Sequence, residues 1–590
     1  MARKIALLQL NQTVGDLAGN VGRIETLLAL AAAAGADAAV ATELAISGYP
    51  PRDLLLQDDF VAACMSAAGT ISTPIPLLVG SPLPGKPRQL PGNGALRIDT
   101  DGGVREVTRK QLLPTYEVFD EARYFSPDSR PGIVRGLGGL DLGVTICEDA
   151  WQHAKLVPSD YQSDPIEQLA VWAGQGVELV ATVNLSSSPF HATKQSSRLT
   201  VARAAAKTLG HPFLLANQVG GNDDLLFDGH SIAALPNGDV VSAPGWVEGV
   251  LLVDLDDFAA SVWITEESSS ANAADFIAAG DEQVIESGGE GELAGGGTSA
   301  QTTDSVLDLL AAVTVGLRDY CHKSGLAKVV LGMSGGIDSS VAACLAVRAM
   351  GPDSVIGISM PSRHSSQHSK DDAQATATAL GLEYLELSIE ELHTVAEKRL
   401  SRELRRGPAL AGENVQARLR GLLVMGIANS RAAMAIATGN KSELAQGYCT
   451  LYGDMVGGYA PLGDLWKSEV YALAVALNEE AISQGKPAPI TQSTMSKPPS
   501  AELSPNQRDD DTLPPYDILD AILQGHIEQG QSEPELVAAG HDAQTVREVL
   551  ERLARTEHKR WQMPPAPRVS VRAFGQGWRQ PLAANHNWRQ

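Results

Sequence analysis

The sequence contains few cysteines and no long apolar run. Its 590 residues include five cysteines, an odd number at irregular spacing. This pattern provides neither a disulfide framework nor the paired spacing of a zinc site, and it is typical of a reducing compartment. No segment approaches the about 18 consecutive apolar residues that a membrane-spanning helix needs. These absences predict a cytoplasmic protein that is not held in a membrane.

Basic residues are also fewer than acidic residues. Lys and Arg total 46 against 70 Asp and Glu, so the formal net charge is −24. Binding to nucleic acid needs a basic surface that neutralises phosphates. The composition therefore argues against nucleic acid as a partner, and an anionic small molecule would have to be held by local lysines and glycine-rich loops.

One stretch divides the chain into two near-equal halves. Residues 280–305 are rich in Gly, Ser and acidic residues and show no periodicity. Such a composition buries too little apolar surface to offset its ordering entropy, and it is typical of linkers. The predicted organisation is a domain over 1–265, a linker over 266–305 and a second domain over 306–590.

The first half mixes strands, helices and hairpins. "KIALLQL", "IPLLVGSP" and "LGVTIC" are strand-like, and Ala/Leu-rich helical spacing covers residues 20–35. Residues 95–110 and 229–244 are predicted hairpins that turn on Asp-Gly-Gly and Asn-Gly. Hairpins among helices predict a mixed α/β sandwich rather than a simple parallel sheet.

The second half is more regular. The strand-like segments "AKVVLGM", "SVIGISM" and "LEYLELSI" alternate with helical spacing over 338–350 and 369–380. This βαβαβ order predicts a doubly wound parallel sheet. The Pro/Asp-rich stretch 497–515 is predicted to be a loop rather than a domain boundary.

The most specific signal lies between the first of these strands and its helix: "LGMSGGIDSS", from Leu331 to Ser340. Its glycines let the backbone approach an anion, while Ser334, Ser339 and the amides at the helix start can bind phosphate. Asp338 can hold a magnesium ion on the same phosphates. The string is neither a Walker loop nor GxGxxG. A plain turn would explain a bare SGG, but the full string in this position predicts a phosphate loop.

The string resembles the pyrophosphate loop of the ATP pyrophosphatase family, which includes GMP, asparagine and NAD synthetases. The resemblance implies a Rossmann-like, adenine nucleotide α-hydrolase-like fold. It also implies adenylation of a carboxyl or carbonyl oxygen, release of pyrophosphate, and displacement of AMP by a nitrogen nucleophile. ATP would be the co-substrate and Mg²⁺ the cofactor, with ATP contacts from Gly332, Met333, Ser334, Gly335, Gly336, Ile337, Asp338 and Ser339.

Four further blocks resemble NAD synthetases, in the same order: "ENVQARLRG", "ATGNKSELAQGYCTLYGDMVGGYAPLGDLWKSEVY", "KPPSAEL" and "EHKRWQMPP". Any one of these residues alone is compatible with a solvated helix face, whereas the blocks together favour the family. The match implies ATP contacts from Thr438 and Lys467, magnesium ligands Asp338 and Glu443, and deamido-NAD contacts from Asn414, Glu443, His558 and Lys559.

The chain departs from the ammonia-only NAD synthetases at two positions. Those enzymes carry a basic and an acidic ligand position where this chain has Leu451 and Gly458. The dinucleotide contacts at these positions are therefore expected from elsewhere, either from another subunit or from the variable loop.

The segment "LGVTICEDAW" raises the question whether Cys147 is a nucleophile or a buried apolar residue. Alone it favours a core residue, because free cysteine is among the most buried residue types. However, Glu43, Lys110 and Cys147 each end a predicted strand, and side chains at strand ends of layered α/β folds converge. A carboxylate, a cation and a thiol are the groups that an amidase needs. No histidine stands at a comparable position beside other candidate catalytic residues, which argues against a Cys-His protease.

The first half resembles the nitrilase (carbon–nitrogen hydrolase) family in "TELAISGYPPRDLL", "RKQLLPTYEVFDEARYF" and "GVTICEDAW". The match implies an αββα sandwich with Glu43 as general base, Lys110 at the oxyanion and Cys147 as nucleophile. "LPTYEVFDEARYF" and "NLSSSPFHATK" further resemble the glutaminase domain fused to NAD synthetase. They imply Glu117 as a second carboxylate in proton transfer, and glutamine contacts from Tyr116, Glu148, Ser188 and Lys194.

Together the two halves resemble the glutamine-dependent NAD synthetases, which implies a ligase that uses ATP, deamido-NAD and L-glutamine and that forms a homo-oligomer. Two alternatives remain. One is an amidotransferase with another acceptor, such as a xanthosine nucleotide. The EHKR and TGNKSE blocks argue against this alternative. The other is a degenerate binding or scaffold protein, against which the intact Glu43, Lys110, Cys147 and SGGIDS speak.

Overall fold

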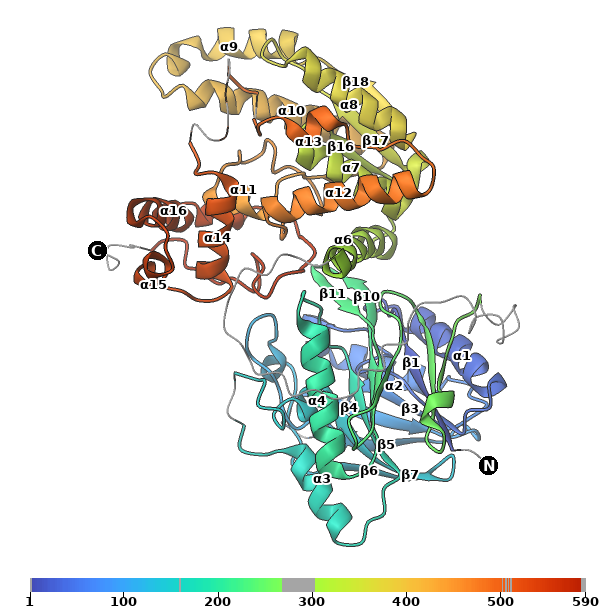
Figure 1. The fold of residues 1–590 in the computed structure, drawn as a ribbon. Coiled ribbons are helices and arrows are strands. Elements are labelled where there is room, and N and C mark those ends of the chain that lie inside the picture. The colour runs from blue at the N-terminus through green and yellow to red at the C-terminus, as the bar shows by residue number, and fades with distance from the viewer. Residues whose placement is uncertain are drawn as a thin grey trace. The chain divides into compact units, whose positions relative to one another are not determined.

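The chain folds into two compact units in the computed structural model (Figure 1). The structure describes residues 3–86, 88–158, 161–267, 303–500, 502–504, 507, 509 and 512–584. One unit comprises residues 1–222 and 226–298, and the other comprises 223–225 and 299–590. The predicted linker 266–305 lies almost entirely outside the described residues, as do parts of the predicted loop 497–515.

The first unit contains two stacked sheets. One has seven strands in the order β15 (Val262–Ile264), β14 (Gly249–Asp254), β1 (Lys4–Gln9), β2 (Ala38–Val40), β3 (Leu77–Leu83), β4 (Gly92–Ile98) and β5 (Val104–Arg109). The other has six strands in the order β13 (Val240–Ser242), β12 (Ile232–Ala234), β9 (Phe213–Asn217), β8 (Ala181–Ser186), β7 (Leu140–Ile146) and β6 (Gly132–Leu137). Strands β10 (Val219–Asn222) and β11 (Leu225–Asp228) form a separate two-stranded sheet.

Alternation along the strands explains the layers of this unit. Ile5 and Leu7 of β1 point into a core shared with β7 and β8 of the other sheet, whereas Ala6 and Leu8 face the helices. Helices α1 (Leu17–Ala33) and α2 (Asp58–Ala68) cover the outer face of the first sheet. Helices α3 (Pro165–Gly174) and α4 (Lys194–Leu209) cover the second. The predicted αββα sandwich is confirmed.

The second unit is built on a parallel sheet. Its order is β18 (Glu383–Glu386), β17 (Val355–Ser359), β16 (Val329–Gly332) and β19 (Met434–Ile436), and every pairing is parallel. The chain winds outward from β16 to β18 and then returns to the other side of β16. This reversal creates a topological switch point between β16 and β19, where doubly wound folds bind their ligands at the carboxyl ends of the strands. The predicted doubly wound sheet is confirmed.

Helices cover both faces of this sheet. Helix α10 packs Val424 and Ala428 on β16, β17 and β19, and α7 packs on the opposite face. Helices α11, α14, α15 and α16 form a separate apolar cluster, whereas α12 packs on α6 and α7. The helices of this unit are α6 (Thr303–Lys323), α7 (Ile337–Met350), α8 (Gln367–Leu380), α9 (Glu390–Leu404), α10 (Leu410–Arg431), α11 (Lys441–Gln446), α12 (Lys467–Ser483), α13 (Gln492–Ser496), α14 (Tyr516–Ile527), α15 (Glu533–Ala538), α16 (Ala543–Arg555) and α17 (Glu557–Arg560).

The strand before Glu43 is shorter than the sequence predicts. Strand β2 ends at Val40, so Glu43 stands in the turn after the strand and not at its last residue. Among the described residues, no helix has both the length and the apolar character that crossing a lipid bilayer requires.

Candidate functional site

Three strand ends of the first unit bring the predicted amidase residues together. Glu43 follows β2, Lys110 directly follows β5, and Cys147 directly follows β7 of the opposite sheet. All three are buried, with exposed fractions of 0%, 0% and 5%. The site therefore lies at one end of the sandwich, where the strands of both sheets stop.

Lys110 and Glu43 form a buried ion pair. The Lys110 Nζ atom donates to Glu43 Oε1 over 2.8 Å. The same carboxylate accepts from Asn93 Nδ2 at 2.7 Å and from the backbone N–H of Ser187 at 3.1 Å. These donors hold the Glu43 carboxylate in a fixed orientation, as a general base requires.

A second carboxylate on Lys110 comes from Glu121 and not from Glu117. Lys110 Nζ lies 2.8 Å from Glu121, whose carboxylate also accepts from Tyr49 Oη at 3.0 Å. Glu117 is exposed, on a turn with left-handed backbone (φ 51°). The second carboxylate on Lys110 is therefore the one four residues after Glu117, and a role of Glu117 in proton transfer stays a prediction. The residue type in "TYEVFDE" gave no basis for choosing between the two carboxylates, because burial decides which of them reaches the lysine.

Charge and burial set the protonation of this cluster. Burial alone would lower the pKa of Lys110, but the carboxylates of Glu121 and Glu43 raise it well above its ordinary value. Burial raises the pKa of Glu121 to about 7, against the opposing effect of Lys110. Lys110 therefore stays a cation, while Glu121 titrates near neutral pH.

Cys147 stands in a strained backbone conformation. Its φ of 44° lies in the left-handed region, at the junction between β7 and a short 3₁₀ turn over Cys147–Ala150. A non-glycine residue in this region signals a functional constraint, and a strand-to-helix turn of this kind presents a nucleophile at the strand end. Burial and the Glu43 charge raise the pKa of the thiol, and Lys110 only partly opposes them. The resting group is a neutral thiol that needs a base.

Asp149 ties the cysteine turn to the end of β5. Its Oδ1 atom accepts from the backbone N–H groups of Gln111 and Leu112, both at 2.9 Å, and its Oδ2 accepts from Ile146 at 3.1 Å. Burial raises the pKa of Asp149 to about 7. Because Lys110 precedes Gln111 and Cys147 follows Ile146, this one carboxylate fixes the lysine and the cysteine relative to each other.

The predicted glutamine contacts include one directly bonded pair, Tyr116 and Glu148. Glu148 accepts from Tyr116 Oη at 3.0 Å and also from Tyr161 Oη at 3.1 Å, which sequence reasoning missed because no motif marks it. The Ser188 hydroxyl is buried and has no hydrogen-bond partner in the described part of the chain. Lys194, the first residue of α4, places its ammonium 4.0 Å from the centre of the Trp151 ring. Glu148 is thus a buried carboxylate held by two tyrosines.

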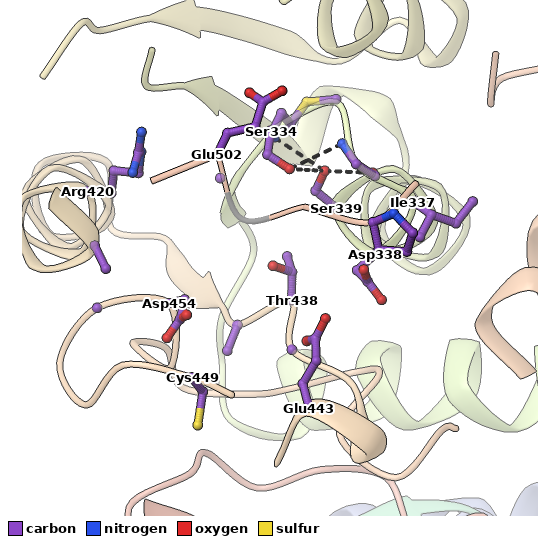
Figure 2. A pocket seen from close by; sticks show the side chains of 18 of the residues that line it. Ser334, Ile337, Asp338, Ser339, Arg420, Thr438, Glu443, Cys449, Asp454 and Glu502 are labelled. Atoms are coloured by element: carbon purple, nitrogen blue, oxygen red, sulfur yellow. Dashed lines mark hydrogen bonds between the residues drawn. The ribbon is translucent and has the colours of Figure 1, made fainter. Parts of the chain in front are cut away.

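The phosphate loop of the second unit follows β16 at the switch point. The hydroxyls of Ser334 and Ser339 lie 3.1 Å apart, and Ser334 Oγ accepts from the backbone N–H of Gly336 at 3.2 Å (Figure 2). Gly335 has a φ of 77°, and a Cβ there would lie 2.1 Å from the carbonyl oxygen of Ser369. Only glycine fits at this point of the loop.

Asp338, Lys467 and Glu443 form an ionic cluster beside this loop. Lys467 Nζ lies 2.5 Å from Asp338 Oδ2 and 3.5 Å from Glu443 Oε1. Asn440 Nδ2 donates to the other Asp338 oxygen at 2.8 Å. Burial and the neighbouring Asp338 carboxylate raise the pKa of Glu443 to about 8. Two carboxylates therefore share one lysine, and Glu443 is readily neutralised.

A cavity of about 320 Å³ opens onto this cluster. Asp338 and Glu443 project into it from one side in the view of Figure 2, with Arg420 on the other. Every predicted ATP contact except Gly335 lines it, namely Gly332, Met333, Ser334, Gly336, Ile337, Asp338, Ser339, Thr438 and Lys467. Arg420, Asp454, Lys497 and Glu502 also line it, although none was singled out from the sequence. They come from segments that meet only in the folded chain.

Three predicted dinucleotide contacts do not line the cavity, which places them outside its first layer of residues. Asn414 Oδ1 accepts from Thr450 Oγ1 at 2.8 Å, and Lys559 Nζ donates to the carbonyls of Gly447 and Cys449, both at 2.7 Å. His558 is exposed. Asn414 and Lys559 therefore brace residues 447–450, a segment whose Tyr448 and Cys449 do line the cavity.

Comparison with known proteins agrees with the two units. A carbon–nitrogen hydrolase family model matches residues 4–262, and an NAD synthase family model matches residues 309–564. A glutamine-dependent NAD(+) synthetase from Synechocystis sp. is 39% identical over 98% of both chains, and one from Thermotoga maritima is 36% identical over 98% of both. A solved structure of such a synthetase from Acinetobacter baumannii, in complex with ADP, has a TM-score of 0.70 and 30% identity over 99% of this chain and 98% of that one.

Proposed function

The chain belongs to the family of glutamine-dependent NAD(+) synthetases, and we propose that it makes NAD from deamido-NAD, ATP and L-glutamine, with AMP, diphosphate and L-glutamate as the other products. The observation that carries this proposal is the presence of two different sites in one chain. One offers a thiol, a base and a buried cation, and the other offers a phosphate loop and an ionic cluster at a cavity.

The first unit would release ammonia from glutamine. Glu43 takes the thiol proton while Cys147 Sγ attacks the carboxamide carbon, and the ammonium of Lys110 stabilises the negative oxygen of the tetrahedral intermediate. Glu43 then gives the proton to the departing nitrogen, so ammonia leaves and a thioester remains. Water, deprotonated by Glu43, cleaves the thioester to glutamate and restores the thiol.

Glutamine recognition is assigned to the residues around Glu148. A buried carboxylate that accepts from Tyr116 and Tyr161 suits the α-ammonium group of the substrate. The Ser188 hydroxyl has hydrogen-bonding capacity to spare, and Lys194 provides a cation for the α-carboxylate. These roles follow from charge complementarity, since burial makes an unpaired charge costly on either partner.

The second unit would activate the nicotinate carboxylate of deamido-NAD. A carboxylate oxygen attacks the α-phosphorus of ATP, diphosphate leaves, and ammonia from the first reaction displaces AMP from the acyl adenylate. The loop amides, Ser334, Ser339 and Lys467 bind the phosphate oxygens and orient the leaving group. The ADP complex of the Acinetobacter baumannii synthetase supports nucleotide binding by this family.

Magnesium fits the ionic cluster. Asp338 and Glu443 offer the carboxylate oxygens that Mg²⁺ prefers, and both face the cavity beside the phosphate loop. The raised pKa of Glu443 supports this assignment, because a nearby dication offsets the repulsion between the two carboxylates. When bound, the metal would neutralise charge on the phosphates. The cytoplasmic location and the homo-oligomer remain predictions.

The test is NAD formation from deamido-NAD, ATP and magnesium, supplied with either glutamine or ammonium. Cys147→Ala is expected to lose glutamine-supported synthesis and to keep ammonium-supported synthesis. Cys64→Ala is the matched control, because Cys64 is an equally buried thiol of the same unit that packs in the apolar core. Retention of both activities by Cys147→Ala would make this cysteine a core residue. A wild-type protein that makes no NAD from either source would refute the acceptor.

A further inference from the structure

Glu443 and Lys467 stand in the first turns of two different helices. Glu443 is the third residue of α11, and Lys467 is the first residue of α12. Both must keep their positions around Asp338 for the cluster to exist, yet their own side chains meet only at 3.5 Å. Contacts beyond this pair hold the two helix starts in register, and one of them is the backbone bond from the Lys441 N–H to the Leu465 carbonyl at 2.8 Å.

Asp520 of α14 contacts both helix starts. Its Oδ1 atom accepts from Ser442 Oγ at 2.5 Å, and its Oδ2 atom accepts from the backbone N–H of Ser468 at 3.0 Å. Ser442 precedes Glu443, and Ser468 follows Lys467. One carboxylate thus reaches the immediate neighbour of each functional residue.

The bridge continues into the backbone of Lys467 itself. The N–H of Lys467 donates to Ser442 Oγ at 2.9 Å, so this hydroxyl accepts from α12 while it donates to Asp520. The first N–H groups of any helix lack partners within that helix. Here the N–H group of Lys467 donates to a serine of α11, and that of Ser468 donates to a carboxylate of α14. The side chain of the N-cap residue, Trp466, makes no capping hydrogen bond.

Asp520 is itself held rigidly. It is 3% exposed, and its neighbours Leu519, Ile522 and Leu523 on α14 are fully buried in the apolar cluster of the second unit. A carboxylate on a packed helix has few alternative positions, and it also complements the positive end of the 17-residue α12. The charge and the geometry therefore act on the same two helix starts.

We propose that Asp520 is a positioning residue for ATP-dependent synthesis, which sets the separation of Glu443 and Lys467 around Asp338 by bridging Ser442 and Ser468. This inference rests on the proposed function for its activity readout. Asp520 does not line the cavity of the second unit. It acts through the backbone, and misplacement of a functional group by about 1 Å can cost about 10²-fold in rate.

Asp520→Asn tests the bridge. The amide keeps the size of the side chain but presents one acceptor and one N–H donor, so it cannot accept from both the Ser442 hydroxyl and the Ser468 N–H. An N–H turned toward Ser442 reverses the direction of that bond, and the negative charge of the bridge is lost. We expect ammonium-supported NAD synthesis to fall about 10- to 100-fold in kcat. Asp517→Asn, on the exposed side of the same helix, controls for the loss of charge, and Ile522→Val controls for a small loss of core stability.

A double-mutant cycle with Ser442→Ala separates positioning from general stability. If Asp520 acts through Ser442, the double variant is expected to be little slower than the slower single variant, whereas independent effects would multiply. A crystal structure of Asp520→Asn should show the Lys467 ammonium displaced from Asp338. Unchanged kcat together with unmoved helix starts would overturn the proposal.

These outcomes are distinct from failure of the proposed function. If the wild-type protein makes no NAD, that function fails, and the positioning role is then decided by the crystal structures of wild type and Asp520→Asn alone. If wild type is active and Asp520→Asn loses activity only in proportion to its loss of folded protein, as Ile522→Val does, Asp520 is a stabilising residue and the inference is wrong.

Discussion

Both units place a lysine between two carboxylates, but they do so in opposite surroundings. Lys110 lies 2.8 Å from both Glu43 and Glu121, and the lysine and Glu43 are fully buried. Lys467 lies 2.5 Å from Asp338 and 3.5 Å from Glu443, at the wall of a cavity of about 320 Å³. We call the buried group of Lys110, Glu43 and Glu121 the closed cluster, and the group of Lys467, Asp338 and Glu443 at the cavity the open cluster.

The difference follows from the chemistry assigned to each unit. Attack by a thiol on a small amide needs a base and a cation already in place, because a buried, fixed charge stabilises a transition state without reorganisation. Transfer to a large nucleotide substrate needs room, and the cluster at the cavity can exchange its internal ion pairs for contacts with phosphates and metal. On these proposed roles the closed cluster needs no further charge, and the open one would be completed by nucleotide and metal.

The largest expected effect comes from removing each lysine in turn. Lys110→Met removes the cation proposed to stabilise the oxyanion and should lower glutamine-supported NAD synthesis by about 10³-fold, while ammonium-supported synthesis is retained. Lys467→Met should lower both activities to a similar degree, because both need the second site. The measurement is the initial rate of NAD formation with each nitrogen source.

Exposed lysines serve as controls for these two variants, namely Lys207→Met in the first unit and Lys398→Met in the second. Both are expected to behave as wild type. Equal loss of both activities in Lys110→Met would contradict the division into two sites, unless its thermal unfolding showed that the whole protein had been lost.

A smaller effect is expected from Glu121→Gln, and it should depend on pH. When Glu121 is ionised, its charge draws the Lys110 ammonium and strengthens Glu43 as a base. Glutamine hydrolysis should therefore rise as pH passes through about 7 in the wild type. In Glu121→Gln this rising limb should be absent and the rate above pH 7 about 10²-fold lower. A pH–rate profile of glutamate release decides the matter, and an unchanged rising limb in the variant would exclude Glu121.

The same pKa predicts a change in stability. Because folding raises the pKa of Glu121 from 4.5 to about 7, folding favours its neutral form. The stabilising contribution is fully present below about pH 4.5 and is lost as pH rises through about 7. The free energy of unfolding of wild type should therefore fall relative to that of Glu121→Gln between these values, as measured by urea unfolding at several pH values.

The sequence predicted the closed cluster in part and the open cluster almost completely, for a physical reason. The phosphate loop is a local structure, so Ser334, Asp338 and their neighbours are consecutive and reach the cavity together, whereas Glu443 and Lys467 were assigned through the resemblance to NAD synthetases. Glu43, Lys110 and Cys147 are separated in sequence and were recognised because each ends a strand-like segment. That rule places a residue at a sheet end, but it does not say which nearby carboxylate turns inward.

Tertiary packing accounts for what sequence reasoning missed. Glu121 and Glu117 lie in the same loop, and only burial distinguishes them. Tyr161 and Asp520 belong to no motif, because each matters through one contact to a distant segment. Lys559 was expected at the dinucleotide, yet its ammonium binds the carbonyls of Gly447 and Cys449, a backbone contact that residue types do not reveal.

The smallest effect we expect is on glutamine recognition, through Tyr161→Phe. This change removes one of the two tyrosine hydroxyls that donate to Glu148, and those hydroxyls lower the pKa of a carboxylate that burial raises. Loss of one donor costs on the order of 1 kcal/mol, so the KM for glutamine should rise about 5-fold with little change in kcat. Ammonium-supported synthesis should be unaffected.

The pH dependence of this variant tests the reason behind the effect. With one donor fewer, the pKa of Glu148 rises further, so a larger fraction of the carboxyl is neutral and unable to hold an ammonium group. The KM for glutamine should therefore increase more steeply toward low pH in Tyr161→Phe than in wild type. Tyr116→Phe, which removes the other hydroxyl, should show the same trend. If neither variant changes the KM or its pH dependence, Glu148 does not bind the substrate ammonium, and the first unit recognises glutamine by another group.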